Sequence, residues 1–155
     1  MAHVRLLTNP NSKIRVCYFT DSAVGMGCSN HRQDVLLVQF FLKSLASKTD
    51  PDFHEVFGVP GAPPLTIDGI CGSSTIAAIK RFQTFVLAKN NPQSPLVDGR
   101  IDVSPRGQPV TTITQATYSI ILLNVNFGVF NGPDRHAALF KEPEFPNELL
   151  YVFFA

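Results

Sequence analysis

The sequence has little of several residue types that mark particular functions. It contains no tryptophan and only 3 tyrosines, which argues against a site that stacks sugar rings on large amphipathic aromatic side chains. Charged residues make up 16% of the chain, against the ~25% usual in soluble proteins, and we therefore expect a partner to cover part of the surface. A formal net charge of +1 leaves no basic stripe for nucleic acid.

Signatures of membranes, metals and cofactors are missing as well. Every uninterrupted apolar run is far shorter than the ~20 residues of a membrane-spanning helix. None of the 4 histidines and 3 cysteines has the spacing of a metal site, so we predict no metal and no cofactor. The odd number of cysteines argues against a complete disulfide framework, although it leaves a Cys17–Cys28 bridge open.

What the sequence does have is enough apolar material for one folded domain over residues 1–155. Hydrophobic residues make up 45% of the chain, a composition that folds rather than staying disordered. Helical spacing of apolar residues and runs of β-formers then locate the elements. We expect helices over residues 30–47, 74–88 and 112–124, strands over 13–20 and 149–154, and a short hairpin between 101–103 and 110–112. The apolar final strand would pair with the first strand or with another chain, because an unpaired edge of this kind associates.

The most informative segment is a glycine-punctuated turn that leads into the second expected helix. Asp68-Gly69 and Gly72 suit a tight turn, whose backbone conformations are resisted by residues with a Cβ. Ser73 then offers the hydroxyl of a helix N-cap. A second pair, Asp98-Gly99, follows that helix. We therefore expect two related Asp-Gly turns.

Two glutamines lie on otherwise apolar helical faces. Gln39 is in the first expected helix and Gln83 is in the second. A buried amide must be hydrogen-bonded, so we interpret each glutamine as holding the backbone of a turn, with direct contact to a ligand as the alternative.

The candidate catalytic residues are weak. Asp68 and Asp98 could form a carboxylate pair, but an aspartate before a glycine also caps its own turn, and that role explains the glycine. Cys71 could be a nucleophile with a distant histidine as its base, but a free cysteine more often packs as a small apolar side chain. We predict that the protein is not an enzyme.

Taken together, these motifs resemble the bacterial peptidoglycan-binding domain, a three-helix cell-wall module. The family pattern runs roughly Asp-Gly-Ile-Phe-Gly, two variable residues, Thr, and then Ala-Val-x-x-Phe-Gln. Here it stands as Asp68-Gly69-Ile70-Cys71-Gly72, Thr75, Ala78-Ile79 and Phe82-Gln83. Residues 35–42 are similar to the first helix of the family, and residues 96–101 to its second Asp-Gly turn. The likeness covers about residues 25–124, which leaves 1–24 and 125–155 as flanking strand and loop extensions.

The resemblance implies a mainly α fold, a three-helix bundle with a small peripheral β element. It implies a non-catalytic module that recognises peptidoglycan through its glycan or its peptide. The positions that it carries over as wall-facing are Thr75, Arg81, Gln83, Arg100 and Tyr118. The chain departs from the family pattern at Cys71, where the family has an aromatic core residue.

The N-terminal residues lack the apolar region and small-residue cleavage site of a signal peptide. We therefore expect action at the bacterial envelope after delivery without a leader, as part of a phage tail or a contractile secretion system. The alternative is a structural adaptor that keeps the fold and binds proteins, for which the low charge and the apolar C-terminal segment are suited.

Overall fold

The fold is mainly helical. The computed structural model describes residues 2–6, 16–47, 64–89, 96–105 and 116–154, and the structural statements below concern these. Within them lie α1 (Arg32–Ala46), α3 (Ser73–Ala88), α4 (Ser119–Asn131), α5 (Pro133–Ala137), the 3-10 turn η2 (Leu139–Lys141) and α6 (Asn147–Phe154). Two small antiparallel sheets pair β1 (His3–Leu6) with β2 (Val16–Phe19), and β3 (Val24–Gly25) with β4 (Arg100–Ile101).

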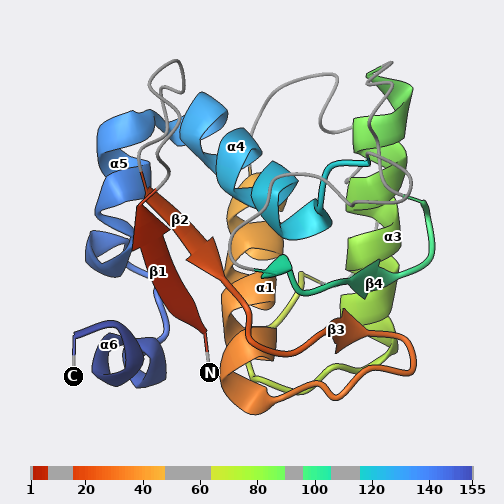
Figure 1. Ribbon diagram of the computed structural model, residues 1–155, viewed down its shortest axis with the longest axis horizontal. Coiled ribbons are helices and arrows are strands. Elements are labelled where there is room, and N and C mark those ends of the chain that lie inside the picture. The colour runs from red at the N-terminus through yellow and green to blue at the C-terminus, as the bar shows by residue number, and fades with distance from the viewer. Residues whose placement is uncertain (1, 7–15, 48–63, 90–95, 106–115, 155) are drawn as a thin grey trace.

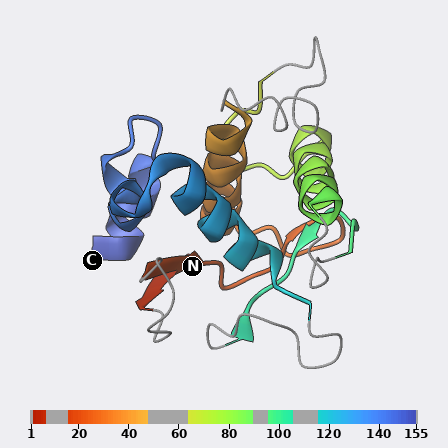
Figure 2. The same ribbon diagram turned by 90° about the horizontal axis from the view of Figure 1, so that it is seen from above.

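Helix α1 is the centre of the arrangement. Figure 2 shows α3 on one side of α1 and α4 with α5 on the other, and α1 contacts α3, α4 and α6. Ten of its fifteen residues are buried, which is why its sequence is apolar nearly all round. The β1–β2 hairpin runs beside α4 and α5, and β3–β4 lies against α3 (Figure 1).

A cluster of aromatic rings joins the central helix to the C-terminal half. The ring of Phe40 lies 5.9 Å from that of Phe127 in α4 and 5.2 Å from that of Phe145, which precedes α6. Cys17 and Phe19 of β2 are fully buried in the same core. The two terminal segments are therefore part of the core and not only peripheral to it.

The predicted C-terminal strand is wrong, because residues 149–154 lie within helix α6. Leu149 is fully buried, Leu150 and Phe153 pack partly against the core, and Tyr151 is 80% exposed. This spacing is that of one helical face, which buries the apolar run without a strand partner. Within the strand predicted at 13–20, residues 16–19 form β2, whose partner is β1, and residues 13–15 lie outside the described residues.

The third helix also differs from its prediction of 112–124, since α4 begins at Ser119 and continues to Asn131. The helix continues past residue 124, and Asn124, Asn126 and Asn131 each donate to the carbonyl four residues earlier, at 2.8, 2.8 and 3.0 Å. Such bonds satisfy the amides within the helix. Residues 110–112 lie outside the described residues, and Ile101 pairs with Val24.

The two other helices begin close to their predicted starts, with different caps. Gly72 is the N-cap of α3, and Ser73 is the first helical residue rather than the cap.

All three cysteines are free, so Cys17 and Cys28 form no bridge. Among the described residues, no helix is both long and apolar enough to cross a membrane.

Candidate functional site

Gln39 holds the Asp68 turn with both ends of its amide. Its Oε1 accepts from the backbone N–H of Asp68 at 3.1 Å and of Gly69 at 2.8 Å. Its Nε2 donates to Asp68 Oδ1 at 2.9 Å, to the Ile70 carbonyl at 3.0 Å and to Thr75 Oγ1 at 3.0 Å. The side chain is only 1% exposed, so the helix buries this amide and the turn satisfies it.

Gln83 holds the Asp98 turn by the same pattern. Its Oε1 accepts from Asp98 N at 3.1 Å and Gly99 N at 2.9 Å, and its Nε2 donates to Asp98 Oδ1 at 2.9 Å and the Arg100 carbonyl at 2.8 Å. The interpretation of both glutamines as supports of turn backbone is confirmed. We call each unit, a helical glutamine with its Asp-Gly turn, a glutamine clamp.

The glycine of each clamp is required by its backbone. Gly69 has φ +74° and Gly99 has φ +75°, in the region that residues with a Cβ rarely adopt. Gly72 differs, because its φ of −92° and ψ of −173° are ordinary extended backbone and a Cβ there would meet nothing within 4 Å. The prediction that Gly72 also holds a costly conformation is therefore wrong.

A short loop, residues 24–30, lies between the two clamps. Gly25 approaches the second turn so closely that a Cβ on it would lie 2.1 Å from the Gly99 carbonyl oxygen. Asn30 holds the loop, accepting from Gly25 N at 2.7 Å and donating to the carbonyls of Gly25 and Cys28 at 3.0 Å. We call this loop with residues 68–70 and 98–100 the twin-turn end of the molecule.

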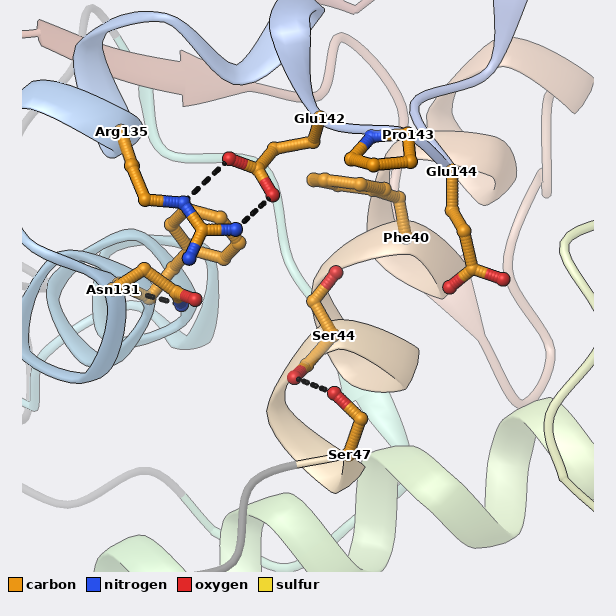
Figure 3. Close-up of a pocket in the computed structure, with 9 residues that line it drawn as sticks. Phe40, Ser44, Ser47, Asn131, Arg135, Glu142, Pro143 and Glu144 are labelled. Atoms are coloured by element: carbon orange, nitrogen blue, oxygen red, sulfur yellow. Dashed lines mark hydrogen bonds and ion pairs between the residues drawn. The ribbon is translucent and has the colours of Figure 1, made fainter.

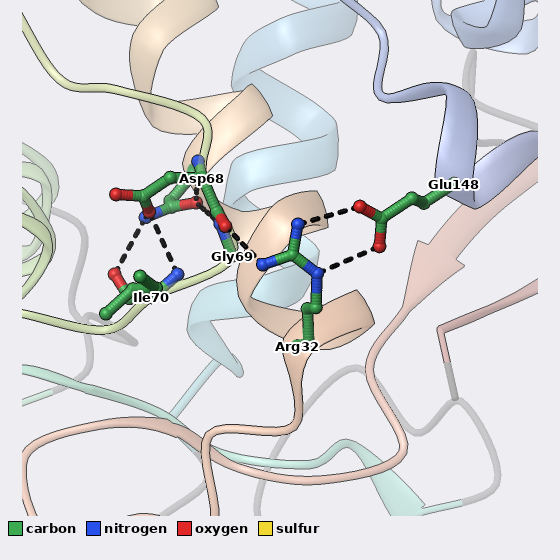
Figure 4. A network of polar contacts seen from close by, with 6 residues as sticks. Arg32, Asp68, Gly69, Ile70 and Glu148 are labelled. Carbon is green, nitrogen blue, oxygen red and sulfur yellow. Dashed lines mark hydrogen bonds and ion pairs between the residues drawn. The ribbon is translucent and has the colours of Figure 1, made fainter.

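Arg32 connects the twin-turn end to the C-terminal helix. Its guanidinium donates to the Asp68 carbonyl and, through Nε and Nη2, to both carboxylate oxygens of Glu148 at 3.0 and 2.7 Å (Figure 4). The Arg32 side chain also covers Gly69, where a Cβ would lie 2.8 Å from its Cγ. The pKa of Glu148 is lowered by this hydrogen bond.

The five residues that the resemblance implies to be wall-facing differ in their exposure and in their contacts. Thr75 and Gln83 are 2% and 1% exposed and belong to the clamps, so neither faces a ligand at the surface. Arg100 is exposed at the twin-turn end. Arg81 is half-buried on α3, and Tyr118 is half-buried just before α4. For these last three, the role in binding stays a prediction.

The catalytic alternatives find little support in the geometry. Asp68 accepts from Ile70 N within its own turn, a bond that lowers the pKa of its carboxyl. Asp98 accepts from Arg100 N in its own turn at 2.9 Å. Burial raises the pKa of the Cys71 thiol, which disfavours the nucleophilic thiolate. Within the described ranges, no group of histidine, cysteine and acidic side chains could hold a metal ion.

Sequence reasoning missed a third buried amide, Asn124 of α4. Its Oδ1 accepts from Tyr18 N at 2.8 Å, its Nδ2 donates to the Tyr18 carbonyl at 2.9 Å, and its Oδ1 lies 2.9 Å from Nε2 of His136. Since that oxygen can only accept, Nε2 must carry the ring proton. Burial lowers the pKa of His136 to about 4, so the ring is neutral. An asparagine on an apolar helical face was the only signal.

One cavity lies away from the twin-turn end, between α1, α4 and the segment that follows α5. Its volume is about 160 Å³, and its wall includes the buried rings of Phe40 and Phe127 and the side chain of Pro143 (Figure 3). Across it, Arg135 forms a two-pronged ion pair with Glu142. This cavity and the exposed part of the twin-turn end are two candidate surfaces for recognition among the described residues.

Comparison with known proteins adds no relative, since no family model, curated protein or solved structure matches this chain.

Proposed function

We propose that this protein is a non-catalytic module that binds bacterial peptidoglycan. The observation that carries the proposal is the pair of glutamine clamps. The three ordered motifs that resemble the peptidoglycan-binding domain contain both glutamines and both Asp-Gly turns. In the structure these residues form one repeated unit, each joining a helix to the turn that follows it.

The clamps support the proposal because they explain the pattern residues by a common geometry. A chance likeness would bring no such match between Gln39 and Asp68, which are 29 residues apart, and Gln83 and Asp98, which are 15 apart. The helices around the clamps also agree with the implied bundle, since α1 contacts both α3 and α4. In this proposal the module belongs to an envelope-crossing apparatus such as a phage tail or a contractile secretion system.

Sedimentation with purified sacculi tests the proposal. The intact chain should pellet with sacculi and stay in solution without them. Arg100→Gln removes an exposed charge at the twin-turn end and should reduce the bound fraction roughly two- to fivefold, the range for one exposed charged contact. Lys89→Gln removes the same charge at the far end of α3 and should have no effect. Failure of the intact chain to pellet would refute wall binding.

A protein-interaction adaptor is the second candidate, and one observation favours it. Apolar side chains are exposed at or beside the twin-turn end, with Ile70 at 65%, Leu96 at 80% and Met26 at 48%. Exposed apolar groups that gather on one surface often mark a protein interface. An adaptor would stay in solution in the sacculus experiment, so the same measurement separates the two functions.

A further inference from the structure

Side chains close the outer edges of three of the four described strands. In β2, Asn124 accepts from Tyr18 N at 2.8 Å and donates to the Tyr18 carbonyl at 2.9 Å. In β3, Asn30 bonds both backbone groups of Gly25 in the same way, at 2.7 and 3.0 Å. In β4, the second clamp bonds the carbonyl and the N–H of Arg100, at 2.8 and 2.9 Å. Backbone groups at a strand edge need such partners, and side chains supply them here where no further strand follows.

The outer edge of β1 has no such closure among the described residues. Val4 is opposite Tyr18 in the antiparallel register. Opposite residues turn their backbone groups either toward each other or both away, and those of Tyr18 face Asn124. The N–H and C=O groups of Val4 therefore point away from β2, as do those of Leu6 two residues on. No described residue bonds them, and Val4 is 39% exposed, so this edge is open to a further strand (Figure 1).

An open strand edge recruits another strand through main-chain hydrogen bonds. A second copy of this chain can supply that strand, because two identical edges in antiparallel order are self-complementary about a two-fold axis. The position of the axis decides which residues meet. An axis at Arg5 sets two arginines directly opposite each other, which is unfavourable. An axis at Leu6 leaves most of β1 unpaired.

An axis at Val4 pairs every residue of β1 and joins residues of opposite charge. It sets Arg5 opposite His3 of the second copy, and the His3 ring lies 2.7 Å from the Asp21 carboxylate. The Asp21 side chain is exposed, so it offers a counter-ion to an arginine from a second copy. An unrelated strand would find the same backbone groups without this match in charge. The edge therefore favours a second copy as its occupant.

We propose that two copies of this chain associate through β1 and form one four-stranded sheet, in the order β2, β1, β1 and β2. Val4 of each copy donates its N–H to the Val4 carbonyl of the other. Four residues from each copy make a small interface, and interfaces under about 1,200 Å² are typical of weak or transient complexes. The dimer should therefore form at high concentration and dissociate on dilution. This inference goes beyond the proposed function and does not depend on it.

Sedimentation velocity of the intact chain, over a dilution series that begins at about 1 mM, tests the association. The average mass should rise with concentration toward that of a dimer. Val4→Pro removes the N–H at the axis but no bond between β1 and β2, and proline is tolerated at such an edge position. It should weaken the dimer roughly tenfold or more. Val4→Thr keeps the N–H and the preference for a strand, so it should weaken the dimer less than about twofold.

Two results would refute the proposal. One is the mass of a single chain at every concentration. The other is a dimer of Val4→Pro as strong as that of the intact chain, which would place the contact elsewhere, for example at the exposed apolar side chains of the twin-turn end. Circular dichroism checks that Val4→Pro keeps the fold, and where it does not, cross-linking decides.

Disulfide cross-linking tests the register without proline. Val4→Cys places two thiols opposite each other with about 5.5 Å between the Cα atoms, a separation that a disulfide spans. With oxidised glutathione as the oxidant, this variant should give a covalent dimer. Leu6→Cys is opposite Ala2 of the second copy and should give no more than the background of the intact chain, whose three cysteines are free. Equal yields for the two variants, or no covalent dimer with Val4→Cys, would overturn the proposed pairing.

Discussion

Replacing Gln39 by methionine should remove the hydrogen bonds that hold the Asp68 turn, while the volume and the helix propensity of the side chain stay similar. The substitution leaves the N–H groups of Asp68 and Gly69 without their acceptor, and Gly69 is buried. An orphaned buried group costs roughly 1–3 kcal/mol, so two should cost about 2–5 kcal/mol, less where water reaches Asp68. That is a large share of the ~5–15 kcal/mol stability of a typical domain.

Thermal unfolding monitored by circular dichroism measures the effect. For a chain of this length a loss of about 2–5 kcal/mol lowers the melting temperature by roughly 5–20 °C. Gln33→Met is the matched control, since Gln33 is on the same helix and takes no part in a clamp. Equal melting temperatures for Gln39→Met and Gln33→Met would refute the clamp as a source of stability.

Gln39→Glu separates the accepting half of the clamp from the donating half. A carboxylate can still accept from the turn N–H groups, but its second oxygen would face Asp68 Oδ1 and the Ile70 carbonyl, which now bind Nε2. Repulsion should raise the folded-state pKa of the new carboxyl above its unfolded value of about 4.3. The loss relative to the unmodified chain should therefore shrink as the pH falls toward that value. A loss that does not change with pH would contradict this reasoning.

Three further predictions concern other parts of the fold. Gly69→Val forces a β-branched residue into φ +74° against Arg32 and should lower the free energy of unfolding, measured with denaturant, by about 1–3 kcal/mol. Gly72→Ala should leave the free energy of unfolding nearly unchanged. Equal effects of the two substitutions would contradict the assignment of the strained backbone to Gly69. Because burial lowers the pKa of His136 from 6.5 to about 4, the unfolded chain gains a proton first, and stability should fall by about 3 kcal/mol between pH 6.5 and 4. This part of the pH dependence should vanish in His136→Gln. Removing residues 147–155 exposes the site of the fully buried Leu149 and should cost about 1.5–3 kcal/mol for each apolar side chain lost from the core, and an unchanged melting temperature would show that α6 is not docked.

The sequence predicted those parts of the fold in which local and long-range signals agree. Helices α1 and α3 lie close to their predicted ranges because their apolar periodicity is strong and glycine marks the start of α3. The C-terminal segment failed because a run of six apolar residues fits a strand and a buried helix equally well. The helix is favoured because it places Leu149 in the core, where its side chain is fully buried.

The candidate sites divide in a similar way. The clamps could be predicted because a buried glutamine amide on an apolar helical face must be hydrogen-bonded, and the two Asp-Gly turns offered backbone groups that needed partners. The cavity could not, since Phe40, Ser44 and Asn131 come together only through the packing of α4 on α1. No spacing along the chain predicts that approach. Residues 125–131 were predicted to lie in a flanking extension, whereas they continue α4, and the Asn131 amide bonds to a carbonyl within its last turn.

The two glutamine clamps close segments of very different length with nearly the same hydrogen bonds. In one clamp the glutamine and its aspartate are 29 residues apart, and in the other they are 15 apart, roughly a doubling. Doubling a flexible loop adds only about 0.6 kcal/mol to the entropy of closing it. Outside residues 40–46 of α1 and 84–88 of α3, the chain between each glutamine and its turn is thus a place where length can be varied at little cost, by natural insertion or by grafting a foreign segment, while the clamp keeps the same hydrogen bonds.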